Sequence, residues 1–210
     1  MKDKTKLILE LPAKNAKNNL DKDCDIIGLK FSEREEVPLL KELLPLIKKP
    51  LMIRGEDEFL PELIENLDRE CIIGIVTENN YKNVVPYAIK GGHTVIIRTP
   101  IDINLAKEMN ILTSDMGLEK ILIDTDIGGI GYGFEYGYSI MEKIKLENDK
   151  YLNKPIISFA CEETAKTKEA KDENSALYLE LTAASAVLAA GADYIVLTDY
   201  RAVKTMREMV

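Results

Sequence analysis

The stretch Ile121–Ile144 reads ILIDTDIGGIGYGFEYGYSIMEKI and shows a structural order that recurs along the chain. An apolar run ends in a carboxylate, a loop rich in glycine follows, and a stretch with the apolar spacing of an amphipathic helix comes last. The apolar run does not alternate with polar residues, which is typical of a strand covered on both faces, as in a parallel sheet. This segment therefore predicts a strand followed by a crossover helix.

Similar apolar runs alternate with helical stretches through the sequence. Glycines stand where a helix is expected to stop before a strand, at Gly91-Gly92, Gly117 and Gly191. Eight alternations predict a compact (β/α)8 TIM barrel that spans residues 1–210 as a single domain, with a doubly wound sheet as the alternative fold. The predicted strands are Leu7–Leu11, Asp25–Lys30, Pro50–Arg54, Cys71–Val76, Thr94–Arg98, Lys120–Asp124, Pro155–Ala160 and Asp193–Thr198.

The connections between these strands are uneven. Pro12–Cys24 is short and polar, so we expect the first crossover helix to be missing or reduced to a turn. Leucines at positions 39, 43 and 46 predict a helix that ends near Lys48–Lys49. Leu177–Ala190 is rich in alanine and leucine, the best helix formers.

Composition excludes several classes of function. The chain has 210 residues, is 46% hydrophobic and carries a net charge of -8, and it has no basic block of the kind that a nucleic-acid surface needs. Cys24, Cys71 and Cys161 are far apart and form no C-x-x-C, so we expect no iron–sulfur or zinc site built by this chain alone. No apolar run has the length of a membrane span, and Leu7–Leu9 is too short for the core of a secretion signal. We therefore expect a cytoplasmic protein.

Polar residues follow the predicted strands. In a barrel of this kind, the chemistry takes place at the carboxyl ends of the strands, so we expect these residues to collect on one rim. The segments are Arg54–Asp57, Thr77–Tyr81, Thr99–Asn104, Asp124–Asp126, Cys161–Thr164 and Thr198–Arg201.

Several of these residues have a structural alternative. Asn79, Asn80 and Asp102 can each cap the helix that follows. Asp124 and Asp126 can form an acid–base pair, or they can bind backbone N–H groups of the loop. His93 is the only histidine and precedes the fifth strand, away from the expected site, so a structural hydrogen bond is expected and a Ser-His-Asp system or a histidine-based metal site is not.

The loop after the sixth strand combines glycine with tyrosine. Glycine allows unusual backbone torsions and the close approach of a ligand, and tyrosine offers a flat apolar face with a polar tip. The loop therefore predicts a pocket wall for something large and flat. It contains no G-x-G-x-x-G, because Phe134 or Tyr136 stands at the last glycine, and no Gly-Lys-Ser/Thr. A site for a bare phosphate is not expected.

Two segments resemble a known family. Glu78–Gly117, with its run PIDINLAK, and Gly131–Leu146, GYGFEYGYSIMEKIKL, are similar to the small (delta) subunit of the corrinoid iron–sulfur protein of the acetyl-CoA decarbonylase/synthase complex. The resemblance extends from about Asp25 to the C-terminus. Thr125-Asp126-Ile127 stands where the family usually has Pro-Thr-Thr.

The resemblance implies a (β/α)8 barrel related to pterin-dependent methyltransferases. It implies a heterodimer with a large subunit that holds the iron–sulfur cluster and a corrinoid-binding domain, while this chain holds no cluster. It further implies that a cobalamin lies between the two subunits and carries a methyl group from a methyl-pterin methyltransferase to acetyl-CoA synthase. Those two enzymes would be further partners, and no nucleic acid or membrane is involved.

The resemblance and the rim position together give a set of residues expected to face the cofactor. Three functions remain open: a non-catalytic subunit that covers the corrinoid, a methyltransferase-like barrel that binds methyl-tetrahydrofolate or methyl-tetrahydromethanopterin through Asp102, Asn104 and Asp124, and an assembly partner without a ligand. No catalytic residue or metal ligand is expected. The cofactor-facing residues are Asn79, Asn80, Asp102, Asn104, Asp124, Gly128, Gly129, Gly131, Tyr132 and Gly133.

Overall fold

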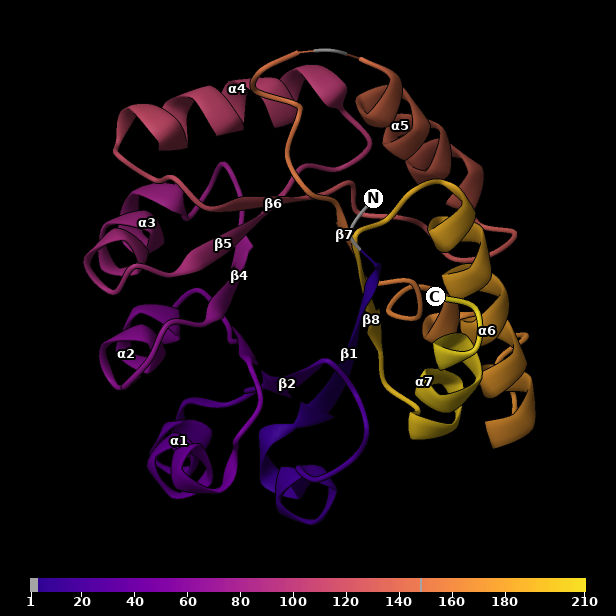
Figure 1. The fold of residues 1–210 in the computed structure, drawn as a ribbon, viewed down its shortest axis with the longest axis horizontal. Helices are drawn as coiled ribbons and strands as arrows, with labels where there is room; N and C mark the ends of the chain where they lie inside the picture. The colour runs from indigo at the N-terminus through magenta and orange to yellow at the C-terminus, as the bar shows by residue number, and fades with distance from the viewer. Residues whose placement is uncertain (1–3, 148) are drawn as a thin grey trace.

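Eight parallel strands form a ring in the computed structural model, which describes residues 4–147 and 149–210 (Figure 1). Hydrogen bonds join the strands in the order β6-β5-β4-β3-β2-β1-β8-β7. A parallel bridge between Ile123 and Ile156 brings β6 and β7 together at the remaining gap. The strands are β1 (Lys6–Pro12), β2 (Ile26–Lys30), β3 (Leu51–Arg54), β4 (Ile72–Val76), β5 (Thr94–Arg98), β6 (Ile121–Asp124), β7 (Ile157–Ser158) and β8 (Tyr194–Leu197).

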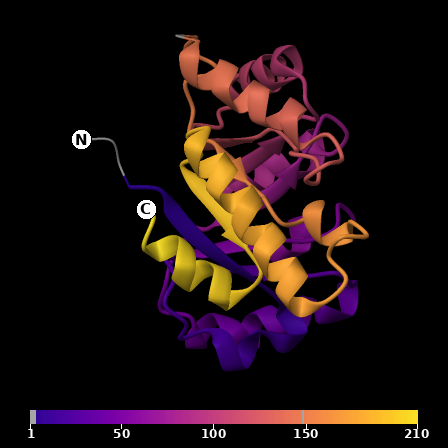
Figure 2. The ribbon, with the colours of Figure 1, turned by 90° about the vertical axis from the view of Figure 1, so that its right-hand side faces the viewer.

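Helices surround the strands (Figure 1). Near the C-terminus, α6 and α7 lie side by side (Figure 2), and the hydroxyl of Ser185 on α6 is 3.7 Å from the sulfur of Met206 on α7. Among the described residues, no helix is both long and apolar enough to cross a membrane. The α-helices are α1 (Val37–Leu43), α2 (Leu60–Glu65), α3 (Tyr81–Lys90), α4 (Ile103–Asp115), α5 (Phe134–Leu146), α6 (Glu173–Ala189) and α7 (Tyr200–Arg207), and the 3-10 helices are η1 (Ala13–Asn19), η2 (Arg34–Glu36), η3 (Leu44–Leu46) and η4 (Thr164–Lys166).

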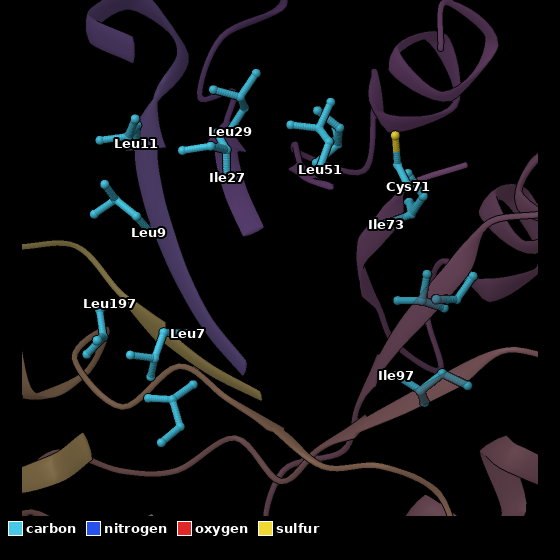
Figure 3. Close-up of a cluster of buried hydrophobic side chains, with 14 of the residues drawn as sticks. Leu7, Leu9, Leu11, Ile27, Leu29, Leu51, Cys71, Ile73, Ile97 and Leu197 are labelled. Carbon is cyan, nitrogen blue, oxygen red and sulfur yellow. The ribbon is translucent and has the colours of Figure 1, made fainter. Parts of the chain in front are cut away.

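The strands have apolar side chains on both faces, because successive residues of a strand point in opposite directions. One set, including Leu7, Leu9, Ile27 and Leu29, packs between the strands and the helices (Figure 3). The other set fills the interior of the barrel and consists of Ile8, Ile26, Met52, Ile96, Leu122, Ile157, Phe159 and Val196. The barrel is thus a packed core, and its interior is closed to solvent below the carboxyl-end rim.

The predicted (β/α)8 barrel is confirmed, with a strand at each of the eight predicted places. The connection after β1 contains only η1, as the short polar sequence predicts. The prediction of a helix ending near Lys48–Lys49 is wrong, because α1 ends at Leu43 and gives way to η3 around Pro45, which has no N–H to continue the helix.

Glycines end the helices as predicted. Gly92, Gly117 and Gly191 have φ of 67°, 100° and 92°, a left-handed conformation that other residues rarely adopt. Each follows a helix and leads toward a strand, so the alternation seen in the sequence is fixed by these turns.

Candidate functional site

The carboxyl-end rim, which we call the mouth of the barrel, is lined by charged side chains on the last residues of the strands. Ile8, Met52 and Ile96 point into the barrel, and two residues later the chain places Glu10, Arg54 and Arg98 on the same inner face. Lys30 and Asp124 follow from β2 and β6 by the same alternation. The strand period therefore puts a ring of charges directly above an apolar core.

These charges form a connected network with Glu162, which lies in the loop after β7. Arg54 donates from Nη1 to both oxygens of Glu10, at 3.0 and 3.1 Å, and from Nη2 to Glu162 at 2.9 Å. Arg98 donates from Nη2 to Glu162 at 3.1 Å and from Nε to Asp124 at 2.6 Å. Glu162 thus joins the two arginines across the mouth.

A phenyl ring lies below the two arginines. The guanidinium carbons of Arg54 and Arg98 lie 4.3 and 5.0 Å from the ring centroid of Phe159, within the range of a cation–π contact. The side chain of Arg54 is 8% exposed and that of Asp124 only 1%. The network therefore closes the centre of the mouth.

Electrostatics fix the charge states of this network. Burial acts to raise the pKa of Glu162, but the guanidinium groups of Arg54 and Arg98 outweigh it and lower that pKa to about 2. Burial acts to lower the pKa of Arg98, yet its carboxylate neighbours hold that pKa above the ordinary value. Burial raises the pKa of Glu10 in spite of Arg54. Glu162 and Arg98 are therefore charged at any physiological pH.

Two hollows remain beside the closed centre. One has a volume of about 280 Å³ and lies near Thr77 and Gly55; the other has a volume of about 500 Å³ and is lined by Phe159 and Val196, with Lys166 at its edge. Lys30 and Glu162 line both hollows and stand 3.7 Å apart. Either hollow can admit part of a ligand, and neither has the size to enclose a corrinoid macrocycle with its side chains.

The glycine–tyrosine loop lies on the outer side of the mouth and packs on the segment after β7. A Cβ on Gly129 would lie 3.0 Å from Thr167 and 3.1 Å from the carbonyl oxygen of Glu163. The hydroxyl of Tyr132 donates to Glu169 at 3.1 Å. Gly131 has φ of 78° with open space around it. The glycines thus serve the fold of the loop, and Tyr132, 53% exposed, is open to a ligand or partner.

The loop's other two predicted glycines also have local roles. A Cβ on Gly128 would meet the carbonyl oxygen of Tyr132 at 2.8 Å, because the loop folds back on itself. Gly133 has φ of 94° and is the N-cap residue that precedes α5. Neither glycine lines the two hollows of the mouth.

The other predicted residues are spread around the rim. Asp102 caps α4 by accepting from the backbone N–H groups of Asn104 and Leu105, at 2.8 and 3.1 Å, and Asn104 is exposed. Asn80 is buried and does not cap α3 with its side chain: it accepts from the N–H of Thr77.

Asn79 is exposed beside the buried Asn80. Asp124 is the predicted residue that lies within the charged network. Its Oδ1 also accepts from the N–H of Asp126 at 3.0 Å, as the loop-carboxylate alternative predicts.

Residues suited to metal chemistry are not gathered at the mouth. His93 lies at the opposite end of the barrel, where its Nδ1 accepts from the buried N–H of Cys71 at 3.1 Å, as expected of a structural histidine. Burial raises the pKa of the Cys161 thiol well above its ordinary value, and the side chain is 4% exposed. In the described part of the chain, no three His, Cys, Asp or Glu side chains are grouped as a metal site.

Arg54 and Glu162 stand in segments that the sequence analysis expected on the rim, but it missed Glu10, Lys30 and Arg98 as residues of the site. It placed the site in the loops after the strands, whereas these side chains are on the strands themselves. The signal that marks them is the two-residue period of a strand: Glu10 and Arg98 stand two residues after the inward Ile8 and Ile96, and Lys30 stands four residues after the inward Ile26. Glu162 carries no such mark, because β7 ends at Ser158 before reaching it.

Solved structures of proteins with quite different sequences have the same fold as this chain. Dihydropteroate synthase from Thermus thermophilus, in complex with 6HMPPP, superimposes with a TM-score of 0.75 at 16% identity, over 99% of this chain and 92% of that chain. The enzyme from Xanthomonas albilineans, with 4-aminobenzoic acid, gives a TM-score of 0.75 at 11% identity, over 99% and 92%.

Curated relatives carry the name acetyl-CoA decarbonylase/synthase complex subunit delta. The protein from Methanocaldococcus jannaschii is 26% identical over 85% of this chain and 49% of its own length. The protein from Methanopyrus kandleri is 28% identical over 59% of this chain and 34% of its own length. This chain therefore matches a third to a half of the length of these relatives.

A family model extends the match over nearly the whole chain. The model for the CO dehydrogenase/acetyl-CoA synthase delta subunit matches residues 8–209, which include β2 to β8 and all of β1 except its first two residues. The chain belongs to the CO dehydrogenase/acetyl-CoA synthase delta subunit family.

Proposed function

We propose that this chain is a non-catalytic subunit of a methyl-transfer complex, and that the mouth of its barrel covers a corrinoid held mainly by a partner subunit. The observation that carries the proposal is the closed centre of the mouth. Arg54, Arg98 and Glu162 occupy the place where an enclosed ligand would sit, so a large flat ligand would lie across the rim. Membership of a family whose relatives are named as subunits of a complex supports a partner.

The exposed residues around the mouth, Ile101, Tyr132 and Tyr136, form what we call its lip, and the lip fits the surface of a corrinoid. Such a molecule combines a broad apolar face with an edge of carboxamide groups. Ile101, Tyr132 and Tyr136 are 42%, 53% and 60% exposed, and they offer apolar area around the charged centre. When bound, the corrinoid supplies a cobalt atom that accepts and releases a methyl group.

Among the described residues, neither cysteine nor histidine offers cobalt a ligand at the mouth. Cys161 is buried with a raised pKa, and His93 is at the other end of the barrel. The role of the described residues is therefore to cover the corrinoid, to orient it and to exclude water from it. The paired charges of the mouth hold a fixed arrangement because every guanidinium already has carboxylate partners.

Size-exclusion chromatography of a mixed sample tests the proposal. The full chain would be combined under anaerobic conditions with the large corrinoid/iron–sulfur subunit of the same organism, either loaded with cobalamin or free of it. We expect the chain to elute with the loaded subunit, with the cobalamin absorbance in the same peak. Separate elution of the chain and the loaded subunit would refute the function.

A second candidate function is the binding of a methyl-pterin in the mouth. The hollow of about 500 Å³ favours it, since this volume is in the range of pockets for small ligands and Phe159 offers a ring to stack on. Structural neighbours of the same fold include a dihydropteroate synthase in complex with pteroic acid. The hydrogen-bonding edge of a pterin needs a free carboxylate, however, and the carboxylates that line this hollow, Glu10 and Glu162, are both bound to arginine.

Calorimetry separates the two candidates. Methyl-tetrahydrofolate and methyl-tetrahydromethanopterin would each be titrated into the chain. The covering function predicts no binding heat with either compound, and saturable heat would favour the pterin-binding barrel.

A further inference from the structure

Two neighbouring loops of the mouth contain a residue with a side chain in the left-handed backbone conformation. Ile101, after β5, has φ of 46°, and Asp126, after β6, has φ of 53°. The loops are in contact, because the N–H of Ile101 donates to the carbonyl oxygen of Thr125 at 3.3 Å. This conformation is costly for a β-branched residue such as isoleucine, and strain of this kind collects at ligand sites.

The carboxylate of Asp126 differs from the other carboxylates of the network. Asp124 and Glu162 accept hydrogen bonds from Arg98, and Glu10 accepts from Arg54. Asp126 lies 3.4 Å from Nε of Arg98, but that nitrogen donates to Asp124. Among residues 4–147 and 149–210, no group donates a hydrogen bond to the Asp126 carboxylate.

Asp126 is not needed to balance the charge of Arg98. Arg98 already has two carboxylate partners in direct hydrogen bonds. Burial raises the pKa of Asp126 in spite of the nearby guanidinium, so the ionised carboxylate would gain from a further hydrogen-bond donor. The side chain is 34% exposed, which leaves it accessible to a ligand on the mouth.

Ile101 has an exposed side chain, and its loop contacts the loop of Asp126 through the hydrogen bond to Thr125. The Ile101 side chain is 42% exposed, which is unusual for an isoleucine. The same residue also bears backbone strain. Together the two residues present an apolar contact and a hydrogen-bond acceptor on the same part of the lip. A corrinoid carries the complementary pair: an apolar ring face and primary carboxamides, whose N–H groups donate.

We propose that Asp126 is a specificity residue that accepts a hydrogen bond from a carboxamide N–H on the corrinoid edge, while Ile101 packs against the adjoining ring face. This inference rests on the proposed covering function. According to this inference, Asp126 distinguishes a corrinoid with a neutral carboxamide from one with a carboxylate at the same position. The charge of Asp126 would repel a carboxylate there.

The test uses the full chain and the cobalamin-free large subunit reconstituted with one of two probes, cobalamin or its monocarboxylic acids, in which one carboxamide is hydrolysed. Affinity for each loaded subunit would be measured by calorimetry for wild type and D126N. Asparagine also tolerates the left-handed conformation, so D126N keeps the loop geometry. E163Q removes a nearby exposed charge and is the matched control.

We expect wild type to bind the cobalamin-loaded subunit about tenfold more tightly than D126N does, the value of one hydrogen bond to a charged group. Wild type should bind at least one of the monocarboxylic-acid complexes more weakly than the cobalamin complex, and D126N should lose that preference. E163Q should behave as wild type.

The outcomes separate this inference from the function on which it rests. If wild type binds the loaded subunit no better than the corrinoid-free one, the covering function is refuted and the inference with it. If wild type prefers the loaded subunit but D126N has the same affinity and the same preference among probes, the covering function stands and the role of Asp126 is refuted.

Discussion

Arg98 and Asp124 face each other at the carboxyl ends of β5 and β6, as register partners in the sheet, and join through a hydrogen bond of 2.6 Å. Arg98 also reaches Glu162 beyond β7, so one side chain ties together three neighbouring segments of the barrel. These contacts link β5 and β6 to the segment after β7, and they form part of the charged floor on which the proposed ligand would lie. Their residues therefore affect stability and binding together.

Replacing Glu162 tests the network. E162Q leaves Arg54 and Arg98 each with one carboxylate fewer, and we expect a loss of about 2–3 kcal/mol in the free energy of unfolding, less than the 3–5 kcal/mol of fully buried pairs because Glu162 is partly exposed. Urea denaturation would measure the loss. E163Q, which breaks only an exposed pair with Lys166, should cost less than about 1 kcal/mol. Equal effects of the two variants would contradict the network.

The same residue predicts a pH dependence. The pKa of Glu162 is about 2 in the folded chain against an ordinary value of 4.5, so its stabilisation is complete above 4.5 and is lost as the pH falls toward 2. We expect the unfolding free energy of wild type to fall more steeply across this window than that of E162Q. Parallel pH profiles for the two proteins would show that Glu162 is not held ionised by the arginines.

Asp102 provides a test of helix capping. D102A removes the acceptor for two backbone N–H groups of α4 and should cost about 1 kcal/mol of stability, whereas D102N keeps an acceptor and should cost much less. Thermal unfolding of both variants measures the difference. A corrinoid-binding defect in D102N without any change in stability would instead assign Asp102 to the ligand.

His93 predicts a second pH effect at the other end of the barrel. Burial lowers its pKa, so its contribution to stability is present above the ordinary value of 6.5 and declines as the pH falls below it. H93N can still accept from the N–H of Cys71 but does not titrate. We expect the melting temperature of wild type to drop more than that of H93N between about pH 7.5 and 5.5. The opposite order would mean that protonated His93 is stabilised in the fold.

Gly131 of the glycine–tyrosine loop and Gly137 of α5 should respond differently to substitution. A Cβ on Gly137 would lie 2.9 Å from the Cα of Ile127, so G137A should cost about 1–3 kcal/mol through overpacking. Gly131 has open space, and G131A should cost about 1 kcal/mol through its backbone conformation alone. G131N should recover part of that loss, as measured by urea denaturation. Equal stability of G131A and G131N would show that the left-handed φ of residue 131 does not determine the cost of replacing this glycine.

The fold could be predicted because each strand and each helix end is marked by residues that are close together in the sequence. Each strand of this barrel is an apolar run, and helices stop at glycines such as Gly117 and Gly191, so the order of elements is readable along the chain. The early end of α1 could be read from Pro45, which interrupts the apolar spacing of its leucines.

The site could be predicted only in part, because its residues are far apart in the sequence and come together only in the folded barrel. Glu10 and Arg54 are 44 residues apart in sequence, and only the sheet register brings their charges together. The loop glycines predict a ligand surface, and the structure adds a second reason for Gly128 and Gly129: a Cβ at either position would meet the loop itself or the segment after β7. Asp124 could be proposed from the sequence because it ends a strand and begins that loop, and it lies in the charged network.

Hydrogen–deuterium exchange on the assembled complex tests the central claim most directly. Exchange of the full chain would be compared alone, with the corrinoid-free large subunit and with the cobalamin-loaded one. The account predicts that loading adds protection to the mouth, in segments 99–104, 125–133 and 162–169, and leaves the opposite end around 91–93 and 117–120 unchanged. Protection confined to that opposite end, or none that depends on cobalamin, would contradict it.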